Sequence, residues 1–137
     1  METDCSLLNL IKELYPICRS ITGEGVRETL RIIQKRVPLE IQEVPSGTKV
    51  FDWTVPPEWN VTDAYVMNRE GKRVIHFQPH NLHLMSYSVK KKKKMTLEEL
   101  RPHLFSLPAH PEWIPYRTSY YKENWGFCMR HVDFEEL

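Results

Sequence analysis

The chain has 137 residues, of which 41% are apolar and 27% are charged, and its formal net charge at pH 7 is +1. A chain of this length can bury one core, and its balanced charge lacks the footprint of a nucleic-acid or membrane-surface binder. No apolar run reaches the length of a membrane span, and the acidic first residues do not have the pattern of a signal peptide. Three scattered cysteines without a CxxC pair favour free thiols, so we expect a cytoplasmic protein.

The first 46 residues predict two helices followed by a strand. Apolar residues at helical spacing predict an amphipathic helix over 3–19, with Pro16 kinking or shortening its last turn. The apolar stripe of that helix comprises Leu7, Leu10, Ile11, Leu14 and Cys18. After a glycine-containing turn, a second helix is predicted over 24–36 and ends before Pro38. The apolar residues of 39–44 then predict a strand.

The middle of the chain predicts a small β-rich unit with prolines at its joints. Alternating apolar residues bounded by turn residues predict strands at 48–55, 61–67, 73–77 and 82–89. Residues 90–94 are five consecutive lysines, which are typical of a solvated loop. Thr96 to Glu99 matches a capping box, in which the threonine caps a helix that we expect over 96–104.

The last segment contains the densest aromatic run of the chain. Its aromatic residues are Trp113, Tyr116, Tyr120, Tyr121, Trp125 and Phe127, and a final strand is predicted over 125–132. The order of elements indicates a mixed fold, α+β or α/β. In this fold an α/β piece at 1–46 is interrupted by an inserted β-rich domain at 47–112 and resumes at 113–137. Because the chain ends without a glycine, a proline or a polar tail, we expect it to be part of a longer protein.

No residue pattern identifies catalytic or metal-binding residues in this chain. His76, His80 and His83 have spacings that a zinc site could use, but Pro79 lies among them and no cysteine or carboxylate is near in sequence. Three surface histidines are the preferred interpretation. Cys18 and Cys128 lie in apolar patterns and are interpreted as packing residues. No nucleophile elbow, phosphate loop or His-Glu-x-x-His motif is present.

Three ordered stretches resemble a known family. They are LYPICRSITGEGVR at 14–27, VPSGTKVFDWTVP at 44–56, and YRTSYY with WGFC at 116–121 and 125–128. Together they resemble the N-terminal part of a bacterial and archaeal family with an aminopeptidase-like domain, formerly a domain of unknown function. The resemblance implies a zinc-exopeptidase scaffold, an α/β sandwich with a small β-rich domain inserted early and a winged helix at the C-terminus. It also implies that the zinc ligands of the full-length protein follow the end of this chain.

We therefore expect the N-terminal portion of a zinc-dependent aminopeptidase-like hydrolase, not catalytic alone. Residues in contact with a peptide-like substrate would be Arg117, Tyr120, Tyr121 and Trp125, since arginine can pair with a carboxylate and the aromatic residues can line a pocket. The expected partner is the remainder of the aminopeptidase-like domain or a second copy of the chain; we expect neither membrane nor nucleic acid. The alternative is a non-catalytic binding or assembly module that pairs through an exposed final strand.

Overall fold

The computed structural model describes residues 2–120 and 122–137. The chain divides into two compact units, the first ending at Val61 and the second covering Thr62–Leu137. Both units are built from short elements, and the strands of the described residues form three separate two-stranded sheets. The mixed α/β class expected from the sequence is confirmed. The division into segments 1–46, 47–112 and 113–137 concerns the longer protein and stays a prediction.

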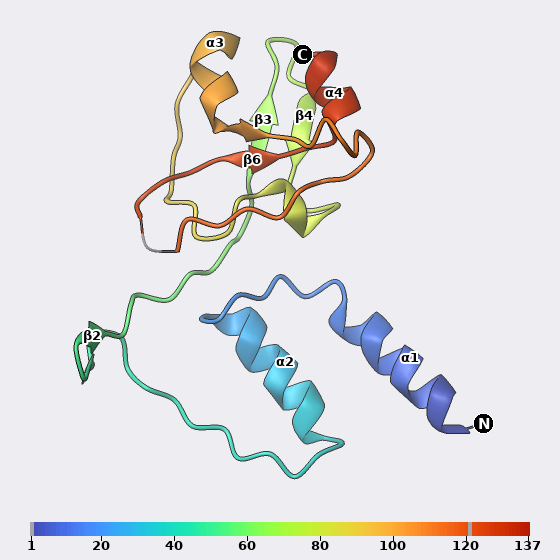
Figure 1. Ribbon diagram of the computed structural model, residues 1–137, viewed down its shortest axis with the longest axis vertical. Coiled ribbons are helices and arrows are strands. Elements are labelled where there is room, and N and C mark those ends of the chain that lie inside the picture. The colour runs from blue at the N-terminus through green and yellow to red at the C-terminus, as the bar shows by residue number, and fades with distance from the viewer. Residues whose placement is uncertain (1, 121) are drawn as a thin grey trace. The chain divides into compact units, whose positions relative to one another are not determined.

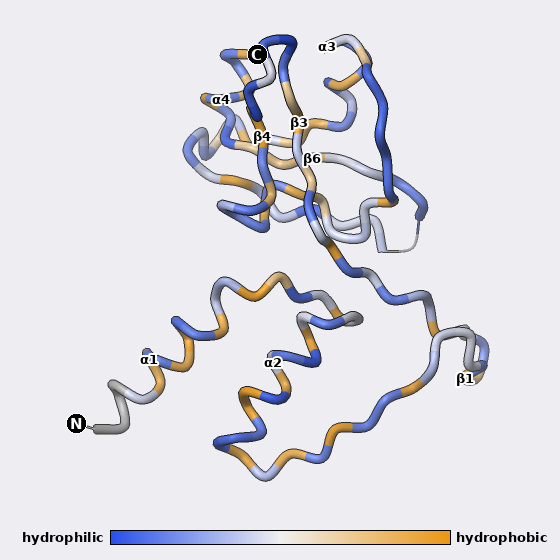
Figure 2. The backbone as a smooth tube through the Cα atoms, turned by 180° about the vertical axis from the view of Figure 1, so that it is seen from behind, coloured by the Kyte–Doolittle hydropathy of each residue, from blue (hydrophilic) through white to orange (hydrophobic). Residues whose placement is uncertain are grey.

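The first unit contains two helices, α1 (Glu2–Leu14) and α2 (Glu24–Gln34), which are joined by a glycine-containing turn (Figure 1). The predicted helix over 3–19 is too long at its C-terminal end. α1 stops at Leu14 because Pro16 has no amide proton and disfavours helical backbone at the residue before it. Figure 2 shows hydrophobic and hydrophilic residues alternating along both helices, as expected for amphipathic helices.

The rest of the first unit departs from the predicted strands. The prediction of a strand at 39–44 is wrong, because among the described residues this segment pairs with no neighbouring strand. The predicted strand at 48–55 is instead a tight hairpin of β1 (Lys49–Val50) and β2 (Trp53–Thr54). Val50 lies opposite Trp53, so the chain must reverse over two residues, and Phe51 adopts a φ of 54° to do so.

The second unit is built around an antiparallel hairpin and a parallel strand pair. β3 (Tyr65–Met67) pairs with β4 (Arg73–His76), which confirms the hairpin predicted from 61–67 and 73–77. Asn68 stabilises its turn, since its side-chain oxygen accepts from the amides of Glu70 and Lys72. β5 (Leu104–Phe105) runs parallel to β6 (Phe127–Cys128).

Short helical elements connect these strands. The capping box is present: the Thr96 hydroxyl accepts from the Glu99 amide, and the Glu99 carboxylate accepts from the Thr96 amide. The helix predicted over 96–104 is divided into α3 (Leu97–Leu100) and the 3₁₀ helix η2 (Arg101–His103), because Pro102 cannot continue α-helical bonding.

Two predicted strands of the second unit are wrong or shortened. Residues 82–89 begin within the 3₁₀ helix η1 (Asn81–His83) and continue as irregular chain with isolated bridges. The strand predicted over 125–132 is limited to β6, and the chain then forms the helix α4 (His131–Glu135), which the sequence pattern did not indicate.

The main hydrophobic core lies in the second unit. Its buried members are Ile75, Leu100, Leu104, Phe127 and Met129, contributed by β4, α3, β5, β6 and the residue after β6. The strand expected to be exposed at the end of the chain is thus buried: Phe127 is 9% exposed and Cys128 is fully buried. In the first unit, the buried residues among 6–61 are Gly23, Thr29 and Ile32.

Candidate functional site

The aromatic segment of the second unit packs on both sides of residues 84–89. On one side, the Ser86 amide donates to the Arg117 carbonyl (2.9 Å) and the Ser119 amide donates to the Ser86 carbonyl (3.0 Å). On the other side, the amides of Met85 and Val89 donate to the carbonyls of Gly126 and Asn124. Backbone pairing of an irregular segment therefore holds residues 117–119 and 124–126 in fixed positions.

Two of the four predicted substrate-binding residues lie near Phe105. The Arg117 guanidinium carbon is 5.3 Å from the centroid of the Phe105 ring. Trp125 stacks on His103 with ring centroids 3.8 Å apart and an interplanar angle of 18°. The Nδ1 of His103 donates to the Trp125 carbonyl oxygen at 2.9 Å, which fixes the tautomer of that imidazole.

The other two predicted residues have different outcomes. Tyr120 is half-buried, and its ring meets Tyr87 edge to face with centroids 4.7 Å apart. Tyr121 lies outside the described residues.

We use the term aromatic cluster for Tyr87, His103, Phe105, Arg117, Tyr120 and Trp125. These residues offer apolar ring faces and one exposed guanidinium, which suit a ligand with an apolar body and a carboxylate.

Gly126 is required for the packing of the aromatic cluster. A Cβ at this position would lie 2.6 Å from Phe105 Cε2 and 2.8 Å from the His103 carbonyl oxygen. Both distances are shorter than van der Waals contact. The glycine therefore allows Trp125 to lie against His103 while the following residue enters β6.

Cys18 and Cys128 are not activated nucleophiles. Burial raises the pKa of the Cys128 thiol to about 11, although the nearby charge and backbone amide of Arg117 act in the opposite direction. Burial also raises the pKa of Cys18. Since the thiolate is the reactive form, both side chains stay protonated and unreactive near neutral pH.

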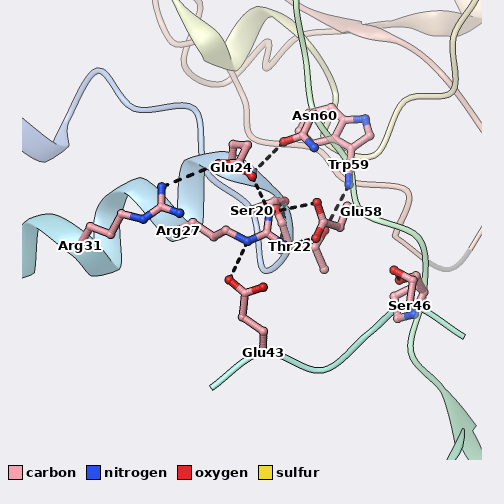
Figure 3. A network of polar contacts seen from close by, with 11 residues as sticks. Ser20, Thr22, Glu24, Arg27, Arg31, Glu43, Ser46, Glu58, Trp59 and Asn60 are labelled. Atoms are coloured by element: carbon pink, nitrogen blue, oxygen red, sulfur yellow. Dashed lines mark hydrogen bonds and ion pairs between the residues drawn. The ribbon is translucent and has the colours of Figure 1, made fainter. Parts of the chain in front are cut away.

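In the first unit, Arg27 joins three acidic side chains that are distant in sequence (Figure 3). Its guanidinium contacts Glu58, Glu43 (2.9 Å) and Glu24 (2.7 Å). The hydrogen bonds that Arg27 donates to these carboxylates, the bond to Glu58 first, raise the pKa of Arg27, and the bond to Glu58 lowers the pKa of that carboxylate. The network ties the first turn of α2 to two extended segments of the same unit; its carboxylates are exposed to solvent, whereas Arg27 is partly buried. We interpret it as structural.

The two glycines of the Thr-Gly-Glu-Gly turn lie at positions where a side chain would clash with the backbone of other residues. Gly23 has a φ of 92°, and a Cβ there would lie 2.5 Å from the Trp59 carbonyl oxygen. A Cβ on Gly25 would lie 2.0 Å from the Cys18 carbonyl oxygen. The Asn60 side chain accepts from the Glu24 amide at 2.8 Å, which satisfies a free amide at the start of α2. The motif is thus a close-packed joint.

A cavity of about 500 Å³ lies beside this joint. Ile17, Cys18, Glu28 and Trp59 are among its lining residues. The cavity is open to solvent and lies in a unit with few buried side chains. It therefore has the character of an uncovered groove more than of an enclosed ligand pocket.

The histidines considered for zinc make separate structural contacts. His76 contacts Asp63 and Arg73, His80 caps η1 by accepting from the Leu82 amide, and the Nδ1 of His83 donates to the Cys128 carbonyl. Within residues 2–120 and 122–137, no group of three or more His, Cys, Asp or Glu side chains could hold a metal ion. The described residues therefore supply no ligand set for the zinc that the family resemblance implies, whose ligands are expected outside this chain.

The side chains of Ser106, His131 and Glu135 form a row of contacts between the residue after β5 and α4. Ser106 Oγ is 2.9 Å from His131 Nδ1, and His131 Nε2 is 3.5 Å from a Glu135 carboxylate oxygen. The order is that of a hydrolytic triad, but the Glu135 side chain is 69% exposed and too far away for a good hydrogen bond. The contacts are better explained as holding α4 beside the residue after β5.

None of the helices in the described part of the chain has the length and hydropathy needed to cross a bilayer.

The Arg27 network and the His103–Trp125 stack were not predicted from the sequence. Only the Glu24 and Arg27 spacing, three residues apart on a helix, could have indicated part of the network.

Comparison with known proteins relates the chain to longer relatives. A family model described as "Domain of unknown function (DUF2172)" matches residues 58–137. A "Putative polysaccharide biosynthesis protein with aminopeptidase-like domain" from Clostridium acetobutylicum is 62% identical over 136 residues, covering 99% of this chain and 31% of the relative. The crystal structure of a "putative peptidase" from the same organism, also 62% identical, has a TM-score of 0.95 and covers 99% of this chain and 32% of that one.

The chain thus spans about a third of the length of the proteins that it matches. Its similarity to them extends over almost all of its residues and over its backbone conformation. The family model covers more than half of the chain, including the whole aromatic cluster. On this evidence, the chain belongs to the family described as Domain of unknown function (DUF2172).

Proposed function

We propose that this chain is the N-terminal portion of a zinc-dependent aminopeptidase-like hydrolase and forms part of the frame of its active site. The proposal is supported chiefly by the 62% identity, over 99% of the chain, to a relative named for an aminopeptidase-like domain. At this identity the fold and the general type of activity are normally shared. Because the chain covers only 31% of the relative, the catalytic residues would belong to the remaining polypeptide.

Within the longer protein, residues 1–46 and 113–137 would belong to the aminopeptidase-like scaffold and residues 47–112 to an inserted domain. When bound, a zinc ion in such an enzyme would polarise the scissile carbonyl and activate a water molecule. The described residues of this chain supply no ligand set for it. Their contribution would be to hold and orient a substrate and to exclude water from it.

The aromatic cluster is the part of this chain that we propose to bind substrate. The Arg117 guanidinium, exposed and lying over Phe105, would pair with a carboxylate of a peptide-like substrate. Trp125, held by His103, would offer an apolar wall of fixed orientation. A rigid aromatic surface loses little conformational entropy on binding, which favours its use in recognition.

The proposal is tested on the full-length protein. Zinc content and hydrolysis of aminoacyl substrates are measured for the natural protein, and then for Arg117→Lys and Arg117→Ala variants. We expect zinc to be bound, and Arg117→Ala to raise KM about tenfold or more because it removes a charge-assisted pair. Arg117→Lys should recover part of the loss, since it keeps the charge without the bidentate geometry. Unchanged KM in both variants would exclude Arg117 from substrate binding.

The alternative of an assembly module that pairs through its final strand loses its structural basis. β6 is buried, pairs with β5 on one side and bridges to Leu84 on the other, so these contacts disfavour pairing with a partner through this strand. If the full-length protein neither binds zinc nor hydrolyses aminoacyl substrates, the hydrolase proposal fails as well.

A further inference from the structure

The first unit exposes much of its apolar surface. Its exposed large hydrophobic residues include Leu7, Leu8, Ile11, Tyr15, Ile21, Val37, Val44, Val50, Phe51 and Trp53. Ile32 is the one large hydrophobic residue of this unit that is buried among residues 6–61. Isolated exposed hydrophobic residues are ordinary on a protein surface, but a whole unit without a core is not. The observation indicates that something covers this unit.

Helix α1 has two apolar stripes. Leu10 and Leu14 are half-buried, whereas Leu7 and Ile11, on the neighbouring stripe, are 58% and 53% exposed. Leu8 and Tyr15 extend the exposed stripe at helical spacing. We call Leu7, Leu8, Ile11 and Tyr15 the uncovered α1 face. A helix that is apolar on two sides is typical of a layer packed between two neighbours, and among the described residues the second of these two stripes is left exposed.

The segment 39–44 lacks a paired strand among the described residues. It carries the apolar residues of a strand, yet it forms no ladder with any described residue. Side chains of α2 hold it at two points: Gln34 donates to the Leu39 carbonyl at 2.8 Å, and Arg27 donates to the Glu43 carboxylate at 2.9 Å. An extended segment with free amides and carbonyls is a template for adding to the edge of a sheet.

We propose that the uncovered α1 face and the segment 39–44 form an interface whose occupant is the polypeptide that the relatives carry outside the matched region. In this interface the α1 face packs on that polypeptide, and 39–44 adds to the edge of its sheet. The inference rests on the proposed function in one respect, that this chain works as part of the longer aminopeptidase-like protein.

Two observations favour this occupant over a second copy of the chain. The matched crystal structure has the same backbone, with a TM-score of 0.95 over 99% of this chain, in a protein about three times longer. This conformation of the first unit is therefore one that accompanies additional polypeptide. A second copy could offer another 39–44 segment or the edge of a two-stranded sheet, and two-stranded sheets are marginal in water. A sheet that already exists satisfies the free backbone groups at lower cost.

The test is amide hydrogen exchange, which does not depend on catalysis. It compares the 137-residue chain with a chimera in which this chain replaces the matched region of the Clostridium acetobutylicum relative. We expect the amides of α1 and of 39–44 to exchange at least about tenfold more slowly in the chimera. The crystallised putative peptidase from the same organism serves as the second measurement at the aligned positions. Equal exchange in the isolated chain, the chimera and the relative would overturn the inference.

A matched pair of variants locates the interface. Ile11→Asp and Asn9→Asp each add one negative charge to α1; Ile11 lies on the uncovered face, whereas Asn9 is an exposed polar residue outside it. In the chimera we expect Ile11→Asp to remove the added protection and Asn9→Asp to keep it. Equal effects of the two variants would refute the assignment of the face. Protection of α1 in the isolated chain that grows with concentration would show that a second copy is the occupant.

The two proposals can fail separately. A chimera with a protected α1 but neither zinc nor hydrolysis would keep the interface and refute the hydrolase. A zinc-binding, hydrolytic chimera with an unprotected α1 would do the reverse.

Discussion

Replacing Gly126 by alanine should destabilise the second unit by forcing apart the joint between β6 and the aromatic cluster. The new methyl group would lie 2.6 Å from Phe105 Cε2 and 2.8 Å from the His103 carbonyl, against ordinary contacts of 3.4–4 Å. The φ of Gly126 is not in the left-handed region, so the cost is steric. Overpacking of this kind costs about 1–3 kcal/mol of unfolding free energy.

The assay is hydrogen exchange of the Met129 amide, measured at increasing urea concentrations. This amide donates to the Phe105 carbonyl at 3.0 Å and lies in the core. Slow exchange of this amide reports unfolding of the second unit alone. A double-mutant cycle with Phe105→Leu isolates the ring contact. We expect the two changes to be coupled favourably by about 1 kcal/mol, because leucine removes the atom nearest the new methyl group. Gly126→Ala within about 0.5 kcal/mol of the wild type would refute the close-packing explanation.

Further predictions concern the core, a helix cap and a thiol. Leu104→Ala should lower the unfolding free energy of the second unit by about 2–5 kcal/mol, measured by urea unfolding, because it leaves a cavity in the core. Thr96→Ala should cost about 0.5–2 kcal/mol at pH 7. The pKa of Glu99 is lowered, first by the Thr96 backbone, so its part of the capping box is lost as pH falls below the usual value of 4.5; the Thr96→Ala effect should therefore shrink at pH 3. Cys128 should react with a thiol reagent at pH 8 only after unfolding. Burial raises the pKa of Cys128 from 9.0 to about 11, so folding favours the protonated thiol. The part of the unfolding free energy that comes from this preference is lost as pH rises through that interval. A capping effect independent of pH, or rapid modification of native Cys128, would contradict these explanations.

Elements with local signals could be predicted from the sequence. α2 and the capping box of α3 depend on apolar spacing and on side chains that bond within one turn, all of which are visible in the sequence. The β3–β4 hairpin depends on a turn with Asn68 and Gly71, and its strands are adjacent in the chain. Each of these predictions was correct because no distant residue decides the outcome.

Elements that depend on distant partners were predicted poorly. A strand exists only where a second strand bonds to it, so the apolar pattern of 39–44 was not sufficient. Residues 84–89 instead bond to two segments more than 30 residues away in sequence, and this arrangement leaves them irregular. α4 was missed because its five residues are too few for a helical period to appear.

The candidate site shows the same division. The aromatic composition drew attention to 113–128, but it did not indicate the stack of Trp125 on His103 or the position of Arg117 over Phe105. Arg27 belongs to a recognised motif, yet its pairing with Glu43 and Glu58 joins parts of the chain that no local pattern connects. Whether the aromatic cluster binds substrate remains a prediction.

The most direct measurement is the intact mass of the natural gene product isolated from its own cells. If this chain is one portion of an aminopeptidase-like protein, the mass should be about three times the 16.4 kDa of these 137 residues, in line with the 31% coverage of the relative. A mass of 16.4 kDa would mean that no further polypeptide follows or precedes them. That result would contradict both the proposed hydrolase and the proposed occupant of the uncovered α1 face.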